Sequence, residues 1–81
     1  MPYINQECRE PLDQIVDKMS DVELKPGELN YILFAFCKRY VPTSYTHYRD
    51  YIGELNECVA EIRRSLLAPY EEKKKMENGE V

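Results

Sequence analysis

The fold depends mainly on residues 45–68, which read YTHYRDYIGELNECVAEIRRSLLA. Apolar and aromatic residues recur there in alternating steps of three and four, the heptad pattern of helices that pack side by side. This seam comprises Tyr45, Tyr48, Ile52, Leu55, Val59, Ile62 and Leu66. A helix that ends at Ala68 would be about 35 Å long. Because fewer than four heptads fit, the seam predicts a helical bundle, within or between subunits, and not a long free coiled coil.

Pro69 follows this helix directly. Proline has no backbone N–H, so we expect the helix to kink or restart there. Residues 69–76 then predict a short fourth helix, with its acids first and its bases last, as the helix dipole favours. Glu71 and Lys75 have the spacing of an ion pair within it. Asn78-Gly79 is a typical C-terminal stop signal.

Two shorter helices are predicted upstream. The first begins near Pro11, after an entry turn at 5–10, because proline is tolerated in a first helical turn. Its apolar positions recur at helical spacing and are Leu12, Ile15, Val16 and Met19. The second covers residues 28–40, after the breaker Lys25-Pro26-Gly27. Residues 41–44 end it, and Thr46 is a favourable N-cap for the long helix.

The second helix is apolar nearly all round, a pattern typical of a helix that is covered on several sides. We interpret it as a subunit interface; a central helix enclosed within one monomer is the alternative. Cys37 is expected to pack there as a small apolar residue. Asn30 is a polar residue in this apolar surrounding and would need a hydrogen-bond partner if buried.

Composition limits the size of the core. The chain has 81 residues, of which 19 are Leu, Ile, Val or Phe. A core of this size supplies only about 3–5 kcal/mol of net stability, so association of subunits is the expected further source of burial. We therefore predict a single all-α domain over residues 1–81, a bundle of three to four helices that forms a homo-oligomer. The composition excludes a membrane span, a multidomain enzyme and a low-complexity chain.

The net charge of −4 disfavours binding to duplex nucleic acid, which needs a basic surface. Residues 1–37 carry seven acids and three bases. They form an acidic surface that could contact a protein partner by charge complementarity. The three cysteines lack metal-ligand spacing, and the N-terminus lacks the pattern of a signal peptide. We expect a cytoplasmic protein with reduced thiols and without membrane contact.

Catalytic and metal-binding patterns are missing from the sequence. His47 is the only histidine, and we interpret it as exposed or packed at an edge. No glycine-rich loop or Cys-His pairing is visible, so we expect neither an enzyme nor a cofactor. Asp50, Glu54, Glu57 and Glu61 share one face of the long helix, opposite the seam. We interpret them as a solvated stripe, since di-metal bundles pair inward carboxylates with Glu-x-x-His motifs.

Arginine and tyrosine are the positive candidates for ligand contact. Arg63 and Arg64 could hold phosphate, although capping of the helix end and pairing with Glu57 or Glu61 explain them equally well. Seven tyrosines offer flat faces for stacking a base, or a wet subunit interface. The candidate ligand set is Asn30, Tyr31, Arg63, Arg64, Tyr70 and Lys73. A secondary basic and aromatic cluster is Lys38, Arg39, Tyr45, Tyr48 and Arg49.

Four segments carry a resemblance over nearly the whole chain. They are MPYINQECR, PGELNYIL, SYTHYRDYIGELNEC and RRSLLAPYEEKKKMENGEV. They resemble a family of small proteins of tailed bacteriophages and of bacterial genomes with mobile elements, for which no activity is assigned. Residues 37–42 depart from that pattern, because related chains tend to have a longer connection there.

The resemblance implies a phage-type accessory role in host takeover or immune evasion, inside the bacterial cytoplasm. Small helical phage proteins of similar size include oligomeric sponges for cyclic nucleotide signals of bacterial defence. By this analogy we expect a homo-oligomer that sequesters a small anionic nucleotide without catalysis. The alternative is a protein-interaction module that inhibits a host or defence protein through its acidic surface.

Overall fold

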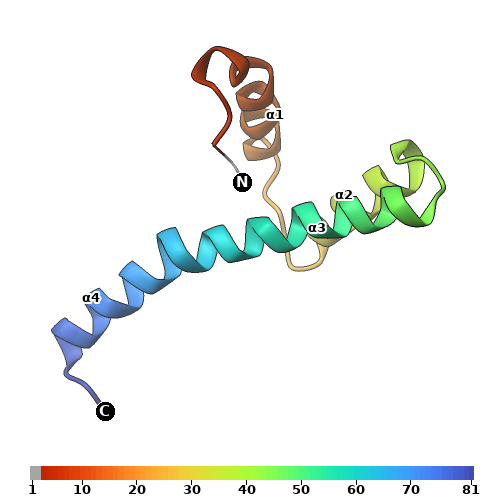
Figure 1. The fold of residues 1–81 in the computed structure, drawn as a ribbon. Coiled ribbons are helices and arrows are strands. Elements are labelled where there is room, and N and C mark those ends of the chain that lie inside the picture. The colour runs from red at the N-terminus through yellow and green to blue at the C-terminus, as the bar shows by residue number, and fades with distance from the viewer. Residues whose placement is uncertain (1–2) are drawn as a thin grey trace. The chain divides into compact units, whose positions relative to one another are not determined.

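The computed structural model describes residues 3–81, and every regular element in that range is helical. In chain order the elements are the 3₁₀ turn η1 (Gln6–Cys8), α1 (Glu10–Ser20), α2 (Glu28–Tyr40), α3 (Tyr45–Ile62), the π-helical segment η2 (Arg63–Leu67) and α4 (Ala68–Asn78). They follow one another along the ribbon in Figure 1. Contacts divide the described chain into residues 3–51 and residues 52–81. The single domain over residues 1–81 stays a prediction.

The predicted entry to the first helix is confirmed. Pro11 lies in the first turn of α1, where its missing N–H costs no hydrogen bond. The preceding residues form η1. The Arg9 Nε–H donates to the Ile4 carbonyl oxygen at 2.6 Å, which ties the start of the segment to the start of α1.

Helix α2 has the predicted bounds, and glycine explains its start. Gly27 has φ +91°, a left-handed conformation that suits glycine, and it directly precedes the helix. The Glu28 carboxylate accepts a hydrogen bond from the Lys25 N–H at 2.7 Å. This hydrogen bond and the Gly27 backbone conformation hold the Lys25-Pro26-Gly27 turn against the first turn of α2.

The predicted N-cap of the long helix is wrong by two residues. Helix α3 starts at Tyr45, and Ser44 caps it. The Ser44 Oγ accepts a hydrogen bond from the His47 backbone N–H at 3.0 Å and lies 2.6 Å from His47 Nδ1. Ser is at least as good an N-cap as Thr by residue type, and the helix begins two residues sooner than predicted. Thr46 therefore lies inside the helix.

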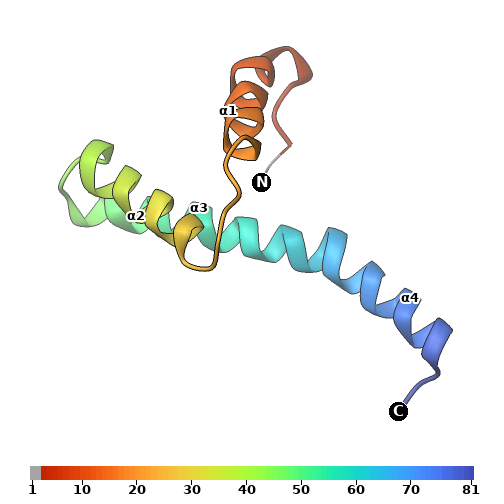
Figure 2. The same ribbon diagram turned by 180° about the vertical axis from the view of Figure 1, so that it is seen from behind.

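Helix α2 runs back beside the first part of α3 in both Figure 1 and Figure 2. Tyr51 makes the contact that joins them: its hydroxyl donates to the Leu33 carbonyl oxygen at 2.6 Å. Its ring stacks on Phe36, with ring centroids 6.3 Å apart and planes at 16°. The ring centroids of Phe36 and Tyr40 lie 5.5 Å apart. This aromatic group closes the hairpin formed by α2 and α3.

Residues 52–81 continue as helix to Asn78. The predicted helix end at Ala68 is wrong, because regular α-helix ends at Ile62 and η2 follows it. The predicted restart at Pro69 is confirmed to within one residue: α4 begins at Ala68, with the proline in its first turn. In η2 the Ala68 N–H donates to the Arg63 carbonyl five residues back. A π turn of this kind changes the carbonyl register just before the residue that cannot donate. The stop at Gly79 is confirmed, with φ +83° and an N–H donated to the Lys75 oxygen at 2.8 Å.

Candidate functional site

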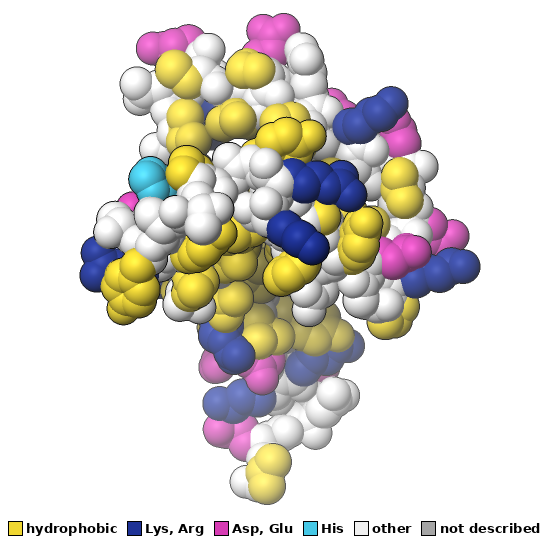
Figure 3. All heavy atoms as spheres, turned by 90° about the vertical axis from the view of Figure 1, so that its right-hand side faces the viewer, with side chains coloured by type: hydrophobic (Ala, Val, Ile, Leu, Met, Phe, Trp, Pro, Cys, Tyr) yellow, Lys and Arg dark blue, Asp and Glu magenta, His cyan; other side chains and the backbone are white. Residues whose placement is uncertain are grey.

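Apolar side chains are exposed on every α-helix. Among residues 3–81 no side chain is fully buried. On α2, Tyr31 and Phe34 are each 64 % exposed, although this helix is the most apolar of the chain. The enclosed helix that was the alternative for α2 is therefore not found in the described chain. Figure 3 shows hydrophobic side chains gathered around the hairpin end, with Lys and Arg among them.

The seam is also uncovered. Leu55 is half-buried, and the other six seam residues are exposed, from Tyr48 at 37 % to Tyr45 at 78 %. Leu66 lies inside η2, so the regular heptad spacing ends at Ile62. The extra residue in a π turn moves the apolar positions that follow it by about one residue. The use of the seam as a packing surface stays a prediction.

The candidate ligand residues lie on separate elements. Asn30 and Tyr31 are exposed on α2 within residues 3–51. The other four belong to residues 52–81 and are Arg63, Arg64, Tyr70 and Lys73. Arg63 and Lys73 are exposed, and the Tyr70 ring has the Lys74 ammonium at 5.7 Å. That these six side chains converge on one ligand pocket stays a prediction.

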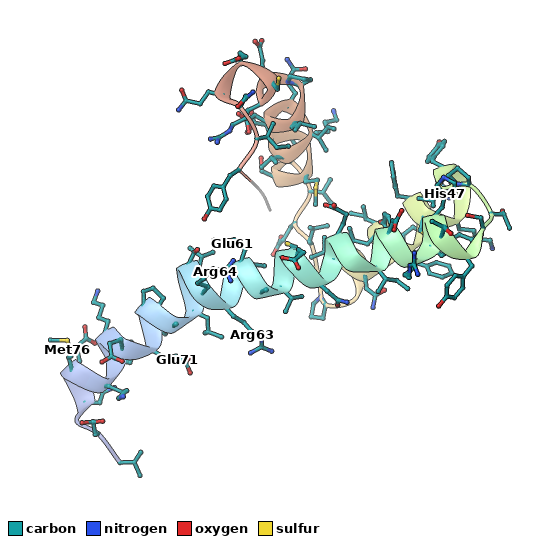
Figure 4. All side chains as sticks on the ribbon, viewed as in Figure 1. His47, Glu61, Arg63, Arg64, Glu71 and Met76 are labelled. Atoms are coloured by element: carbon teal, nitrogen blue, oxygen red, sulfur yellow. The ribbon has the colours of Figure 1, made fainter. Side chains whose placement is uncertain are left out.

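Arg64 is held by a neighbouring acid. Its guanidinium lies 2.5 Å from the Glu61 carboxylate, and Ser65 donates to the other Glu61 oxygen. The Glu61 side chain is only 12 % exposed, against 59 % for Arg64. Figure 4 shows Glu61 and Arg64 on the same side of the helix. This pairing is the non-ligand explanation of Arg64, and it uses one guanidinium nitrogen that a phosphate could otherwise bind.

The secondary basic and aromatic cluster forms in part. The Arg49 guanidinium lies over the Tyr45 ring at 5.6 Å, one turn along α3. Lys38 and Arg39 are exposed in the last turn of α2, where positive charge suits the helix dipole. Tyr48 is less exposed than Tyr45, at 37 % against 78 %. His47 is exposed beside its cap Ser44.

Tyr51 is the residue that the sequence analysis missed. Burial raises its pKa above the usual value of 10.0, and the neighbouring Cys37 thiol raises the pKa further. The neutral phenol is therefore favoured, as a donor to a backbone oxygen requires. Its only sequence signal is a large polar aromatic residue next to the seam. Cys37 itself is half-buried, whereas Cys8 and Cys58 are exposed.

One predicted charge pair, Glu71 with Lys75, is replaced by others. Lys75 pairs with Glu72 at 3.7 Å and with Glu80 at 3.4 Å, not with Glu71. Lys74 pairs with Glu77 at 3.2 Å. On the acidic stripe of α3, three carboxylates are exposed and Glu61 is turned to Arg64. Within the described residues no group of three His, Cys, Asp or Glu could hold a metal ion.

Comparison with known proteins identifies the family. The chain matches DUF6899, a domain of unknown function, over residues 1–81. The chain belongs to this family. No curated protein matches it, and no solved structure does. None of the helices in residues 3–81 combines the length and apolar character needed to cross a membrane.

Proposed function

We propose that this DUF6899 chain is a non-catalytic binding protein that acts as a homo-oligomer through the uncovered faces of its helices. One observation carries the proposal: large apolar side chains are exposed on every α-helix of residues 3–81, and none is buried. Apolar patches of this extent are typical of interaction surfaces. The resemblance to phage proteins agrees with an accessory role against host defence.

The test is the mass in solution. We expect sedimentation velocity to give an oligomer at micromolar concentration. Phe34→Glu should shift the protein toward monomer, because Phe34 is 64 % exposed and a charge there opposes burial between subunits. Asn56→Glu is the matched control, since it adds a negative charge at an exposed polar position of α3. A wild-type monomer at these concentrations would refute the proposal.

A small anionic nucleotide is the first ligand class to test. Support comes from two exposed cations of residues 52–81, Arg63 and Lys73, and from the exposed ring of Tyr70 in the same region, which could stack a base. Calorimetric titration with cyclic di- and trinucleotides and ADP-ribose derivatives measures binding directly. We expect affinity to fall as salt is raised and to be lost in Arg63→Ala. Absence of binding at tens of micromolar would rule out this ligand class.

A protein target is the second candidate, and α1 supports it. Its first turn holds Glu10 and Asp13, Asp17 follows one turn later, and all three are exposed beside exposed Ile15 and Val16. An acidic and apolar helix of this kind suits a basic partner surface. Asp13→Lys should weaken capture of such a partner, and Gln14→Lys on the same helix should weaken it less. Equal effects of the two variants would exclude a specific acidic contact.

A further inference from the structure

The charged side chains near η2 that lie outside the ion pairs described above include two of opposite sign on one side of the helix (Figure 4). These are Arg63, at the start of η2, and Glu71, in the first turn of α4; both are exposed. In Figure 4 both point to one side of the helix, and Glu61 and Arg64 lie on the other. Of the other nearby charges, Glu61 pairs with Arg64 and Glu72 with Lys75, whereas Lys73 is exposed. Arg63 and Glu71 are therefore available to an external partner.

The π segment explains why these two residues share a side. Residues eight apart in a regular α-helix differ by about 80° around the axis. A π turn holds one more residue per turn, so eight residues across η2 come close to two full turns. Arg63 and Glu71 thus lie about two turns apart along one face. Between them in sequence are the exposed apolar residues Leu66, Leu67 and Tyr70.

We propose that this face, Arg63 to Glu71, binds the same face of a second copy with the two helices antiparallel. A face with a cation at one end and an anion at the other matches itself only in that orientation. Arg63 of each copy then meets Glu71 of the other, as a two-fold axis near Leu67 requires. A parallel pair would place like charges together, which is unfavourable. Leu67, one turn from each charge on this face, is then buried near the axis.

This inference rests on the proposed homo-oligomer and names the surface and orientation of its contact. Two charge reversals and their combination test it. Arg63→Glu and Glu71→Arg each create two like-charge contacts per dimer, so each should raise the dissociation constant at least about fivefold at low salt. The combined variant Arg63→Glu/Glu71→Arg restores both attractions with reversed polarity. It should return the dissociation constant to near the wild-type value.

Sedimentation equilibrium measures these constants, and circular dichroism checks that each variant keeps its helix content. Glu57→Arg is the matched control: it makes the same charge change as Glu71→Arg on the acidic stripe and should leave the constant unchanged. Raising the salt concentration should shrink the effects of the single reversals, since exposed charges are screened. If one of the two single-reversal variants loses helix content, the other single-reversal variant and the combined variant still test the contact.

Three results would overturn the inference. If both single-reversal variants have the dissociation constant of the wild type, this face is not the contact, although the proposed function stands. If the combined variant is as weak as the singles, Arg63 and Glu71 do not meet across the interface. A monomeric wild type would refute both. A role of Arg63 in nucleotide capture gives a different pattern, because Glu71→Arg would then strengthen anion binding.

Discussion

Residues 3–51 and residues 52–81 are held by contacts of different range. In the first region Tyr51 reaches 18 residues back to the Leu33 carbonyl oxygen, and its ring stacks on Phe36. In the second, the side-chain contacts described above join residues three to five positions apart. Local contacts alone give a helix only marginal stability in water. The hairpin therefore has a tertiary contact of its own, whereas the side-chain contacts described in the second region are local.

The largest expected effect comes from removing that tertiary contact. Tyr51→Ala eliminates a hydrogen bond worth about 1 kcal/mol and an aromatic contact worth about 1 kcal/mol more. We therefore expect a loss of about 2 kcal/mol in the free energy of unfolding, measured by urea denaturation at fixed protein concentration. Met76→Ala in the second region, at a side chain that is 83 % exposed, is the control and should cost well under half as much. Equal losses would contradict the difference between the regions.

The N-cap of α3 gives the next effect. Ser44→Ala removes the hydroxyl that accepts the His47 N–H, so it should cost about 1 kcal/mol. Thr46→Ala, at the residue that the sequence favours, should change the free energy of unfolding by less than about 0.5 kcal/mol. Urea denaturation of both variants checks this order. The reverse order would mean that the helix begins at the later residue.

Alkaline pH tests the same hairpin without a mutation. Because the pKa of Tyr51 is raised in the folded chain, its stabilising contribution is complete below the ordinary tyrosine pKa of 10.0. It is lost as the pH rises through the higher folded value, since the unfolded chain then gives up its proton first. We expect thermal stability to decline at high pH less steeply in Tyr51→Phe than in the wild type. Parallel declines in the two proteins would show that Tyr51 does not titrate as described.

The smallest effect is expected from the ion pairs of α4. Lys75 contacts Glu72 and Glu80, but its side chain is 50 % exposed, so water and salt screen the attraction. Lys75→Ala should change the free energy of unfolding by less than about 0.5 kcal/mol, and added salt should remove the difference. A larger loss of stability in thermal denaturation would show that local charge pairs contribute substantially to the stability of the second region.

Helix positions were predictable because their signals are local. Pro11 at a helix start, Gly27 before α2 and Gly79 after α4 act through their own backbone conformations, and the structure confirms all three. The π segment that precedes Pro69 was not predictable. It depends on how several consecutive carbonyls rearrange into η2, and residue type does not report that rearrangement.

The candidate site was predictable only as a set of residue types. Arg64 was assigned to a ligand and also to a nearby acid, and the structure pairs it with Glu61. Tyr51 was missed because its role depends on the Leu33 carbonyl oxygen of another helix. The pairing of Lys75 with Glu72 in place of Glu71 reflects side-chain geometry within one turn, which spacing alone leaves open.

By itself the sequence determined an all-helical chain, the bounds of α2 and the excess of apolar surface. Each follows from periodicity, backbone preference and composition, which act over a few residues. Only the tertiary structure decided that Tyr51 closes the α2–α3 hairpin and that η2 turns Arg63 and Glu71 to one side. Both depend on the relative placement of atoms from different turns or helices, and such placement follows from the packing of the whole segment.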